Sequence, residues 1–262
     1  MKNVIIYVIC WSLFALTMAS CQKDDNLENP LEDKKIIAEK TINASTQVQL
    51  LADKDLAVGY QNVYVRVLKD GKTNPSDKIE FSPVMDMVTM KHGAPTGKFA
   101  FNSSVDAFQG FVVFTMPTAN DGIWAIDLKI NNETLNIPVV IKPAATGNVP
   151  VKSFTATDNK RYIMALVQPS SPKIGINDLE VMVFWRENMF SFPVVDGLTL
   201  DFHPEMTSMN HGSSNNVSPQ GSGAGIYNGK VNFSMSGDWR LFFNVKKGET
   251  ELAKDVFLDV LF

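Results

Sequence analysis

The stretch Trp124-Ala-Ile-Asp-Leu-Lys-Ile130 places large apolar side chains at every second position. A period of two is typical of a β-strand with one face on a core and the other in solvent. Similar short runs, rich in β-branched and aromatic residues, are Asn62-Val-Tyr-Val-Arg-Val-Leu68, Lys98-Phe-Ala-Phe101, Phe111-Val-Val-Phe114 and Ile137-Pro-Val-Val-Ile141. Turn residues such as Asn120-Asp-Gly122 separate them. Short strands at this spacing, without a helical period of useful length, predict an all-β fold built as an antiparallel sandwich.

The pattern restarts in the second half of the chain, after a stretch (143–150) that contains two prolines and a glycine. An ungapped alignment of the halves at an offset of 119 residues includes seven identical pairs of Met, His, Gly and Phe residues. They are Met87 and Met206, Met90 and Met209, His92 and His211, Gly93 and Gly212, Gly110 and Gly229, Phe114 and Phe233, and Met116 and Met235. A longer turn in the first copy then brings Trp124 opposite Trp239. Because chance would not give this many matches at one register, we predict two tandem sandwich domains.

The N-terminus resembles a bacterial lipoprotein signal. Lys2 precedes an apolar run, 4–18, that has the length of a signal-peptide core and is short for a membrane span. The run leads into Leu16-Thr-Met-Ala-Ser-Cys21, which is similar to a lipobox, with Met where Leu is usual. We therefore expect residues 1–20 to be a signal peptide and Cys21 to carry the lipid.

The residues after the cysteine predict where the protein is anchored. Gln22-Lys-Asp-Asp25 resembles an acidic tag of outer-membrane lipoproteins, so we expect an outer membrane lipoprotein that faces the periplasm or the cell surface. The polar composition up to about Asn43 is typical of a tether. The expected organisation is a lipidated cysteine and flexible tether at 21–43, a first domain at 44–143, a linker at 144–152 and a second domain at 153–262.

Charge and cysteine usage exclude several classes of function. The net charge is −4, and removal of the signal would take one lysine and no acid, which argues against nucleic acid as a partner. The only cysteines are Cys10 and Cys21, so the folded part has none. Disulfides, thiolate metal sites and a cysteine nucleophile are therefore excluded there.

Soft metal ligands are concentrated in the repeated segments, which hold all three histidines and seven of the ten methionines that follow the signal. On a strand, side chains two apart share a face, so Met90 and His92 project together, as do Met209 and His211. Thioether and imidazole groups suit copper, whereas hard cations prefer oxygen. The candidate ligands are Met85, Met87, Met90 and His92 in the first copy and His203, Met206, Met209 and His211 in the second, with Glu205 as an optional hard ligand.

A structural interpretation of the same residues stays open. Methionine is an adaptable core residue that favours contact with aromatic rings, and Met116 and Met235 alternate with phenylalanines as inner-face residues do. Each His-Gly pair could instead end a strand in a tight turn, with the glycine at positive φ and the histidine bonded to the backbone. Trp124 and Trp239 are expected to begin buried strands and are not candidate ligands.

Each copy thus reads Met-x-x-Met-x-His-Gly, then aromatic-x-Gly, Phe-x-Met, a turn and Trp. This pattern resembles the YtkA-like family of bacterial extracytoplasmic domains, over nearly all of residues 44–262. The resemblance implies two immunoglobulin-like β-sandwiches and a role in copper handling. The second copy, with His203-Pro-Glu-Met206 ahead of its motif, is the closer match. In the ungapped alignment Val84 occupies the position of His203, which sets the copies apart.

Catalysis has little support in the sequence. The serines near His211 lack a nucleophile-elbow context, and Gly221-Ser-Gly-Ala-Gly225 lacks the lysine and helix of a phosphate-binding loop. Two functions remain. The first is a copper-binding lipoprotein that buffers the ion or exchanges it with a donor or acceptor protein. The second is a metal-free tandem sandwich that acts as a scaffold or adhesive module at the cell surface.

Overall fold

The computed structural model describes residues 31–262. All of the regular secondary structure in this range consists of β-strands. The expected all-β fold class is confirmed. The expectations for the signal peptide, for Cys21 and for the first part of the tether fall outside the described residues. Between residues 31 and 262, no helix has the length and apolar composition needed to cross a bilayer.

The first sandwich consists of two antiparallel sheets, with strand orders β1-β2-β3-β7-β6 and β5-β4-β8-β9. Its strands are β1 (Lys35–Asn43), β2 (Thr46–Ala52), β3 (Gly59–Lys69), β4 (Ile79–Met87), β5 (Met90–Gly93), β6 (Ala100–Asn102), β7 (Ala107–Phe114), β8 (Gly122–Ile130) and β9 (Glu133–Val139).

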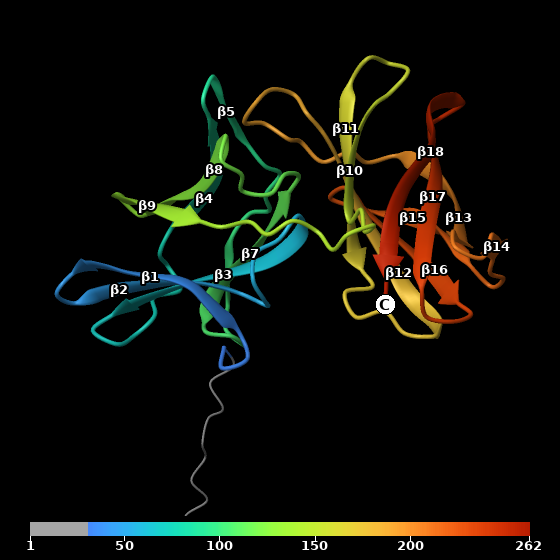
Figure 1. Cartoon of the computed structure of the whole chain (residues 1–262). Helices are drawn as coiled ribbons and strands as arrows, with labels where there is room; N and C mark the ends of the chain where they lie inside the picture. Colours follow the sequence, from blue (N-terminus) through green and yellow to red (C-terminus); the bar gives the residue numbers. More distant parts are fainter. Residues whose placement is uncertain (1–30) are drawn as a thin grey trace, which may run out of the picture.

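The second sandwich repeats this order element for element, as β10-β11-β12-β16-β15 and β14-β13-β17-β18. Its strands are β10 (Val151–Thr155), β11 (Arg161–Gln168), β12 (Gly175–Trp185), β13 (Leu198–Met206), β14 (His211–Gly212), β15 (Val217–Gly223), β16 (Ile226–Phe233), β17 (Asp238–Lys247) and β18 (Thr250–Leu261). Figure 1 shows the two sandwiches side by side, the first in blue to green and the second in yellow to red.

Each sandwich has its own core between its two sheets. Along β8 the side chains of Trp124 and every second residue after it are buried, as the alternating sequence predicts. Trp124 packs edge-on against Phe114 of the facing sheet, with ring centroids 5.1 Å apart. Trp239 and Phe233 make the equivalent contact at 5.3 Å in the second sandwich. Each tryptophan therefore links the two sheets of its own domain.

Two boundaries differ from the expected organisation. β1 occupies Lys35–Asn43, within the stretch expected to be a tether, and pairs along its length with β2. The alternation of apolar and polar residues in β1 is weak in the sequence, because β1 is an edge strand that carries lysines and a glutamate. Such charges on an edge strand discourage pairing with other chains. β10 begins at Val151, inside the expected linker.

The sandwiches pack together through the outer faces of their corresponding five-stranded sheets. The first contributes the outer face of β3 and β7, and the second contributes β11 and β12. Phe111 and Phe184 meet in this contact, with ring centroids 6.2 Å apart. Burial raises the pKa of Tyr60 to about 12, and the charge of Glu180 on β12 adds to the effect. The buried residues of the contact are Val113, Val151, Ile163, Ala165, Met182 and Phe184.

A loop of the second sandwich reaches over to the first. This loop joins β12 to β13, and Figure 1 shows it extending toward the β4–β5 hairpin. There the backbone N–H of Gly93 donates to the carbonyl of Met189 at 2.7 Å. The hairpin that carries the first Met/His motif is therefore in direct contact with the other domain.

Candidate metal-binding clusters

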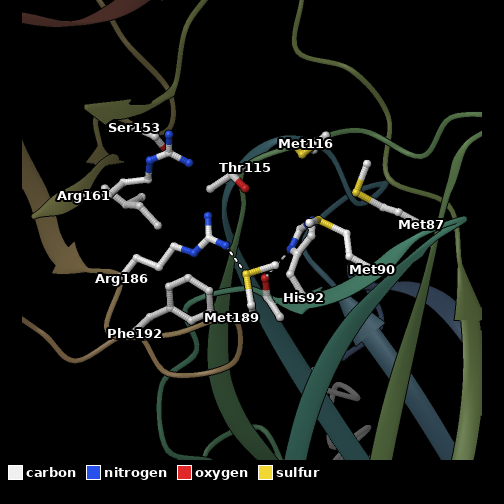
Figure 2. Close-up of a pocket in the computed structure, with 12 residues that line it drawn as sticks. Met87, Met90, His92, Thr115, Met116, Ser153, Arg161, Arg186, Met189 and Phe192 are labelled. Carbon is white, nitrogen blue, oxygen red and sulfur yellow. Dashed lines mark hydrogen bonds between the residues drawn. The ribbon is translucent and has the colours of Figure 1, made fainter. Parts of the chain in front are cut away.

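The first cluster lies in a cavity between the domains. Met87 and Met90 are paired at the tip of the β4–β5 hairpin, and with His92 and Met116 they line a cavity of about 240 Å³. Met189, from the loop of the second domain, lines the opposite wall. Figure 2 shows the sulfur of Met90 beside the ring of His92. Four thioethers and one imidazole thus border one space.

The orientation of His92 determines which of its nitrogens can bind. Its Nδ1 lies 2.8 Å from the carbonyl oxygen of Gly93, and its ring stands edge-on to Trp124 at 5.4 Å. A carbonyl oxygen can only accept, so Nδ1 carries the proton in the neutral ring and Nε2 keeps its lone pair. Histidines that bind metals are commonly held in this way by a backbone carbonyl.

The second domain repeats this arrangement. Nδ1 of His211 lies 3.0 Å from the carbonyl oxygen of Gly212, and the ring stands edge-on to Trp239 at 5.6 Å. Nε2 of His211 is buried and has no hydrogen-bond partner among residues 31–262. A buried nitrogen without a partner costs free energy, so this atom is a position that a ligand would satisfy.

Each tryptophan also holds the backbone of a methionine through a hydrogen bond. Nε1–H of Trp124 donates to the carbonyl of Met116 at 3.1 Å, and Nε1–H of Trp239 donates to the carbonyl of Met235 at 2.9 Å. The side chains of these methionines are 39% and 37% exposed, so the interpretation of both as inner-face core residues is wrong. In each domain one indole therefore contacts the histidine ring and fixes the backbone of this methionine.

Met85 and Met206 do not belong to these clusters. They are 1% and 6% exposed and lie in the two hydrophobic cores. The Cε of Met85 is so close to Gly122 that a Cβ there would lie 2.2 Å away, and Met206 has the same relation to Gly237 at 2.3 Å. Both thioethers are packing groups, and their assignment as ligands fails on burial.

The strand pairing changes the alignment of the two copies. Met85 pairs with Trp124 and His92, and Met206 pairs with Trp239 and His211, so Met206 corresponds to Met85 and not to Met87. The first hairpin is longer by two residues, which an ungapped alignment cannot represent. In this register the counterpart of His203 is Ser82, and Val84 corresponds to Glu205.

His203 and Glu205 point away from the second cluster. Along β13 the side chains alternate, with Pro204 and Met206 buried and His203 and Glu205 on the other face. The His203 ring stacks on Phe242, with centroids 5.1 Å apart and planes at 15°. The expected second-copy site of four ligands therefore does not converge. Its remaining members are Met209 and His211, joined by Met235.

The glycines after the histidines have a role other than the expected one. Neither Gly93 nor Gly212 has a positive φ. A Cβ on Gly93 would lie 3.3 Å from the carbonyl oxygen of Pro83, and one on Gly212 would lie 3.2 Å from that of Pro204. They permit close approach of the short strand to its neighbour, while the expected bond from histidine to backbone is present.

The charges around the two clusters differ in sign. Beside Met209, Asp238 accepts hydrogen bonds from Ser208 and Thr207, which lower the pKa of Asp238 to about 2. The first cavity is lined instead by the guanidinium groups of Arg161 and Arg186. A cation is therefore favoured at the second cluster and opposed at the first.

Hard metal sites find no support in the described part of the chain. Among residues 31–262, no three His, Cys, Asp or Glu side chains are grouped so that they could hold an ion. Zinc, calcium and magnesium sites are built from such groups. Any site in these clusters must instead combine imidazole with thioether sulfur, a set that suits copper and in particular Cu(I).

These features define a class, a tandem β-sandwich protein whose domains each present a Met–His cluster on a buried tryptophan. Residues 157–242 match the YtkA-like family model, which spans β11 and extends into β17. The second sandwich is thus a YtkA-like domain, as its motif indicated. The matched range includes Met209, His211 and Met235.

Similarity to other known proteins is low. No curated protein sequence matches the chain significantly. Among solved structures, the Escherichia coli adhesin FdeC is 12% identical, with 82% of this chain and 64% of that chain aligned and a TM-score of 0.26. A conserved domain protein from Bacillus anthracis is 12% identical, with 89% and 92% aligned and a TM-score of 0.30. The chain thus spans less than two thirds of the adhesin structure, and at these scores neither likeness carries an argument.

Proposed function

We propose that the protein is an envelope-anchored lipoprotein whose second domain binds Cu(I) through His211, Met209 and Met235, and which buffers the ion or exchanges it with a partner protein. The observation that carries the proposal is the buried Nε2 of His211, which has no hydrogen-bond partner among the described residues. Its lone pair is available because Nδ1 is bonded to a carbonyl. It is a binding function and not a catalytic one.

The surroundings of His211 support this choice of ion. The two methionines supply soft sulfur, and their side chains are 59% and 37% exposed, so an incoming ion can reach them. The indole of Trp239 lies edge-on to the imidazole and holds the Met235 backbone. Asp238 adds a negative charge beside Ser208, the residue that precedes Met209.

A competition titration against a chromophoric Cu(I) chelator, under anaerobic conditions, tests the proposal. We expect one tight site in the wild type and at least about a tenfold loss of affinity in His211→Gln. His203→Gln is the matched control, because it removes an imidazole from the same domain on the opposite face of β13. Equal affinities of wild type, His211→Gln and the control would reject the proposal.

The methionines are tested by isosteric substitution. Met→Leu changes remove sulfur while conserving volume, so the fold is little affected. We expect Met209→Leu and Met235→Leu to weaken Cu(I) binding, and Met206→Leu, in the core beneath, to leave it unchanged. X-ray absorption of the loaded protein should contain sulfur and nitrogen scattering that decreases in the two affected variants.

The anchor is part of the same proposal and is supported by the sequence at Cys21. We expect the protein to incorporate a fatty-acid label and to fractionate with the outer membrane. Cys21→Ser should abolish labelling and release the protein in soluble form. Labelling that survives this substitution would contradict the anchor without affecting the copper site.

A metal-free role as a scaffold or adhesive module is the second candidate. The observation in its favour is the pair of guanidinium groups at the first cluster, since they oppose a cation where the sequence motif is equally complete. If neither domain binds Cu(I) in the titration, this second function takes the place of the first.

A further inference from the structure

We propose that the cavity between the two domains binds a small organic carboxylate with an aromatic body, whose carboxylate contacts Arg161 and Arg186. This inference concerns the first cluster alone and does not rest on copper binding by the second domain. The cavity is the space of about 240 Å³ bordered by the β4–β5 hairpin, by β11 and by the loop after β12.

The two arginines are held next to each other by the backbone. Arg161 begins β11 and Arg186 follows the last residue of the neighbouring strand β12. The backbone N–H of Arg186 donates to the carbonyl of Arg161 at 2.8 Å. Like charges at adjacent positions on paired strands repel each other. Figure 2 shows both guanidinium groups turned toward the space that they share with Thr115.

Neither arginine has an acidic partner. Within residues 31–262, Arg66 and Arg240 form ion pairs with aspartates, whereas Arg161 and Arg186 form none. The one side-chain hydrogen bond of Arg186 is to the sulfur of Met189, a weak acceptor. The chain carries more acids than bases, so two adjacent unpaired guanidiniums are an unusual arrangement. The single negative charge of a carboxylate placed between them would offset part of their mutual repulsion.

The other residues that line the cavity indicate which kind of uncharged group the ligand carries. Two hydroxyls, of Thr115 and Ser153, lie in the cavity and make no side-chain hydrogen bond to residues 31–262, so they are free to contact the carboxylate. The other walls are apolar and rich in sulfur, which favours contact with an aromatic ring. They are formed by Met87, Met90, Met116, Ile163, Met189 and Phe192. A charged head and an aromatic body therefore fit opposite parts of one cavity.

Calorimetry and NMR with benzoate as the probe test this assignment on the full chain after removal of the signal. We expect saturable binding of benzoate and weaker binding of benzyl alcohol, which lacks the charge, and of acetate, which lacks the ring. In the wild type, benzoate should shift the amide signals of His92, Thr115 and Arg186. Benzoate that does not saturate, or that binds no better than either comparator, would overturn the proposal.

Substitution of the arginines measures how much their guanidinium groups contribute to benzoate affinity. Arg161→Gln and Arg186→Gln should each reduce benzoate affinity about tenfold or more, because each removes a charge-assisted hydrogen bond. Arg66→Gln removes the same charge from the first domain at a site away from the cavity and should leave the affinity unchanged. Affinities unaffected by both cavity substitutions would overturn the proposal, and the wild-type NMR shifts decide the matter if a variant fails to fold. Cu(I) titration of the second domain is independent of every one of these results.

Discussion

The ring of His211 stands at 88° to the indole of Trp239, with the centroids 5.6 Å apart. His92 and Trp124 repeat this relation at 89° and 5.4 Å. A fully buried tryptophan thus orients a partly exposed histidine in both domains. Core packing and the candidate binding surface are joined through one residue in each sandwich.

Trp239→Phe should affect stability and binding together. The smaller ring leaves a gap in the core and removes the Nε1–H bond to the Met235 carbonyl, so we expect the free energy of unfolding to fall by about 2–4 kcal/mol. Cu(I) affinity of the second domain should also fall, since His211 and Met235 lose their common support. Urea denaturation and chelator competition measure the two effects. Unchanged affinity in a folded variant would show that the indole has no part in the site.

His203→Ala should leave both the stability and the Cu(I) affinity of the protein nearly unchanged. The ring stacks on Phe242 on the solvent-facing side of β13, where substitutions typically change stability by about 0.5 kcal/mol or less. Thermal unfolding and Cu(I) titration should both match the wild type. A clear loss of Cu(I) affinity would mean that His203 is a ligand after all.

Asp238 should make the second cluster sensitive to acid. Its pKa is lowered to about 2 by hydrogen bonds from Ser208 and Thr207, so the folded state favours the ionised form. The stabilisation is complete above the ordinary value of 3.8 and is lost as the pH falls toward 2. The stability difference between wild type and Asp238→Asn, measured by urea denaturation, should therefore be constant near neutrality and shrink below about pH 4.

Ser208→Ala provides the control for this mechanism. It removes the donor that has the largest influence on Asp238, so an NMR titration of the Asp238 carboxyl should give a pKa above that of the wild type. If the pKa is the same in both proteins, the hydrogen bond is not its cause.

Gly229→Ala should destabilise the sheet edge of the second domain. An added Cβ would lie 2.3 Å from the carbonyl oxygen of Val217 and 3.0 Å from the nitrogen of Pro219, both backbone atoms of β15. Because backbone cannot move aside as a side chain can, we expect a loss of about 1–3 kcal/mol in the free energy of unfolding. Gly221→Ala, which meets a tyrosine ring at 3.3 Å, is the milder comparison. A smaller loss in Gly229→Ala than in Gly221→Ala would contradict this prediction.

Ala165→Asp should separate the domains. Ala165 is fully buried in the contact between the sandwiches, and an unpaired carboxylate there is costly unless the contact opens. Small-angle scattering should give a larger radius of gyration, and proteolysis near residues 143–150 should become faster. Each sandwich should keep its own core. A radius of gyration equal to that of the wild type would argue against this account of the interface.

Local patterns in the sequence predicted the sandwich well, because alternation reports burial on one face of each strand. In β8 the buried side chains of Trp124, Ile126, Leu128 and Ile130 follow the alternation seen in the sequence. β1 escaped detection because an edge strand beside solvent carries charges and needs little apolar surface.

The site was harder to predict, because it depends on the length of a hairpin and on contacts between distant segments. The first hairpin has two extra residues, which shift the register between the copies. An ungapped alignment therefore matches Met206 with Met87, although Met206 is structurally equivalent to Met85. Period-two spacing correctly indicates that His203 and Met206 lie on opposite faces, and this signal was present in His203-Pro-Glu-Met206. Arg186 and Met189 gave no local signal, since they reach the first cluster only through domain packing.

The contact between the sandwiches joins the outer faces of the two corresponding five-stranded sheets, through β3 and β7 on one side and β11 and β12 on the other. The contact is offset, because β3 corresponds to β12 whereas β7 corresponds to β16 and β11 to β2, so an exact twofold axis does not relate the two domains. Equivalent loops therefore differ in their surroundings, since the loop after β12 contacts the other domain at Gly93, although both domains have the same strand order. The offset contact thus gives one shared framework two different environments, so a substitution at equivalent positions of the two domains need not have the same effect.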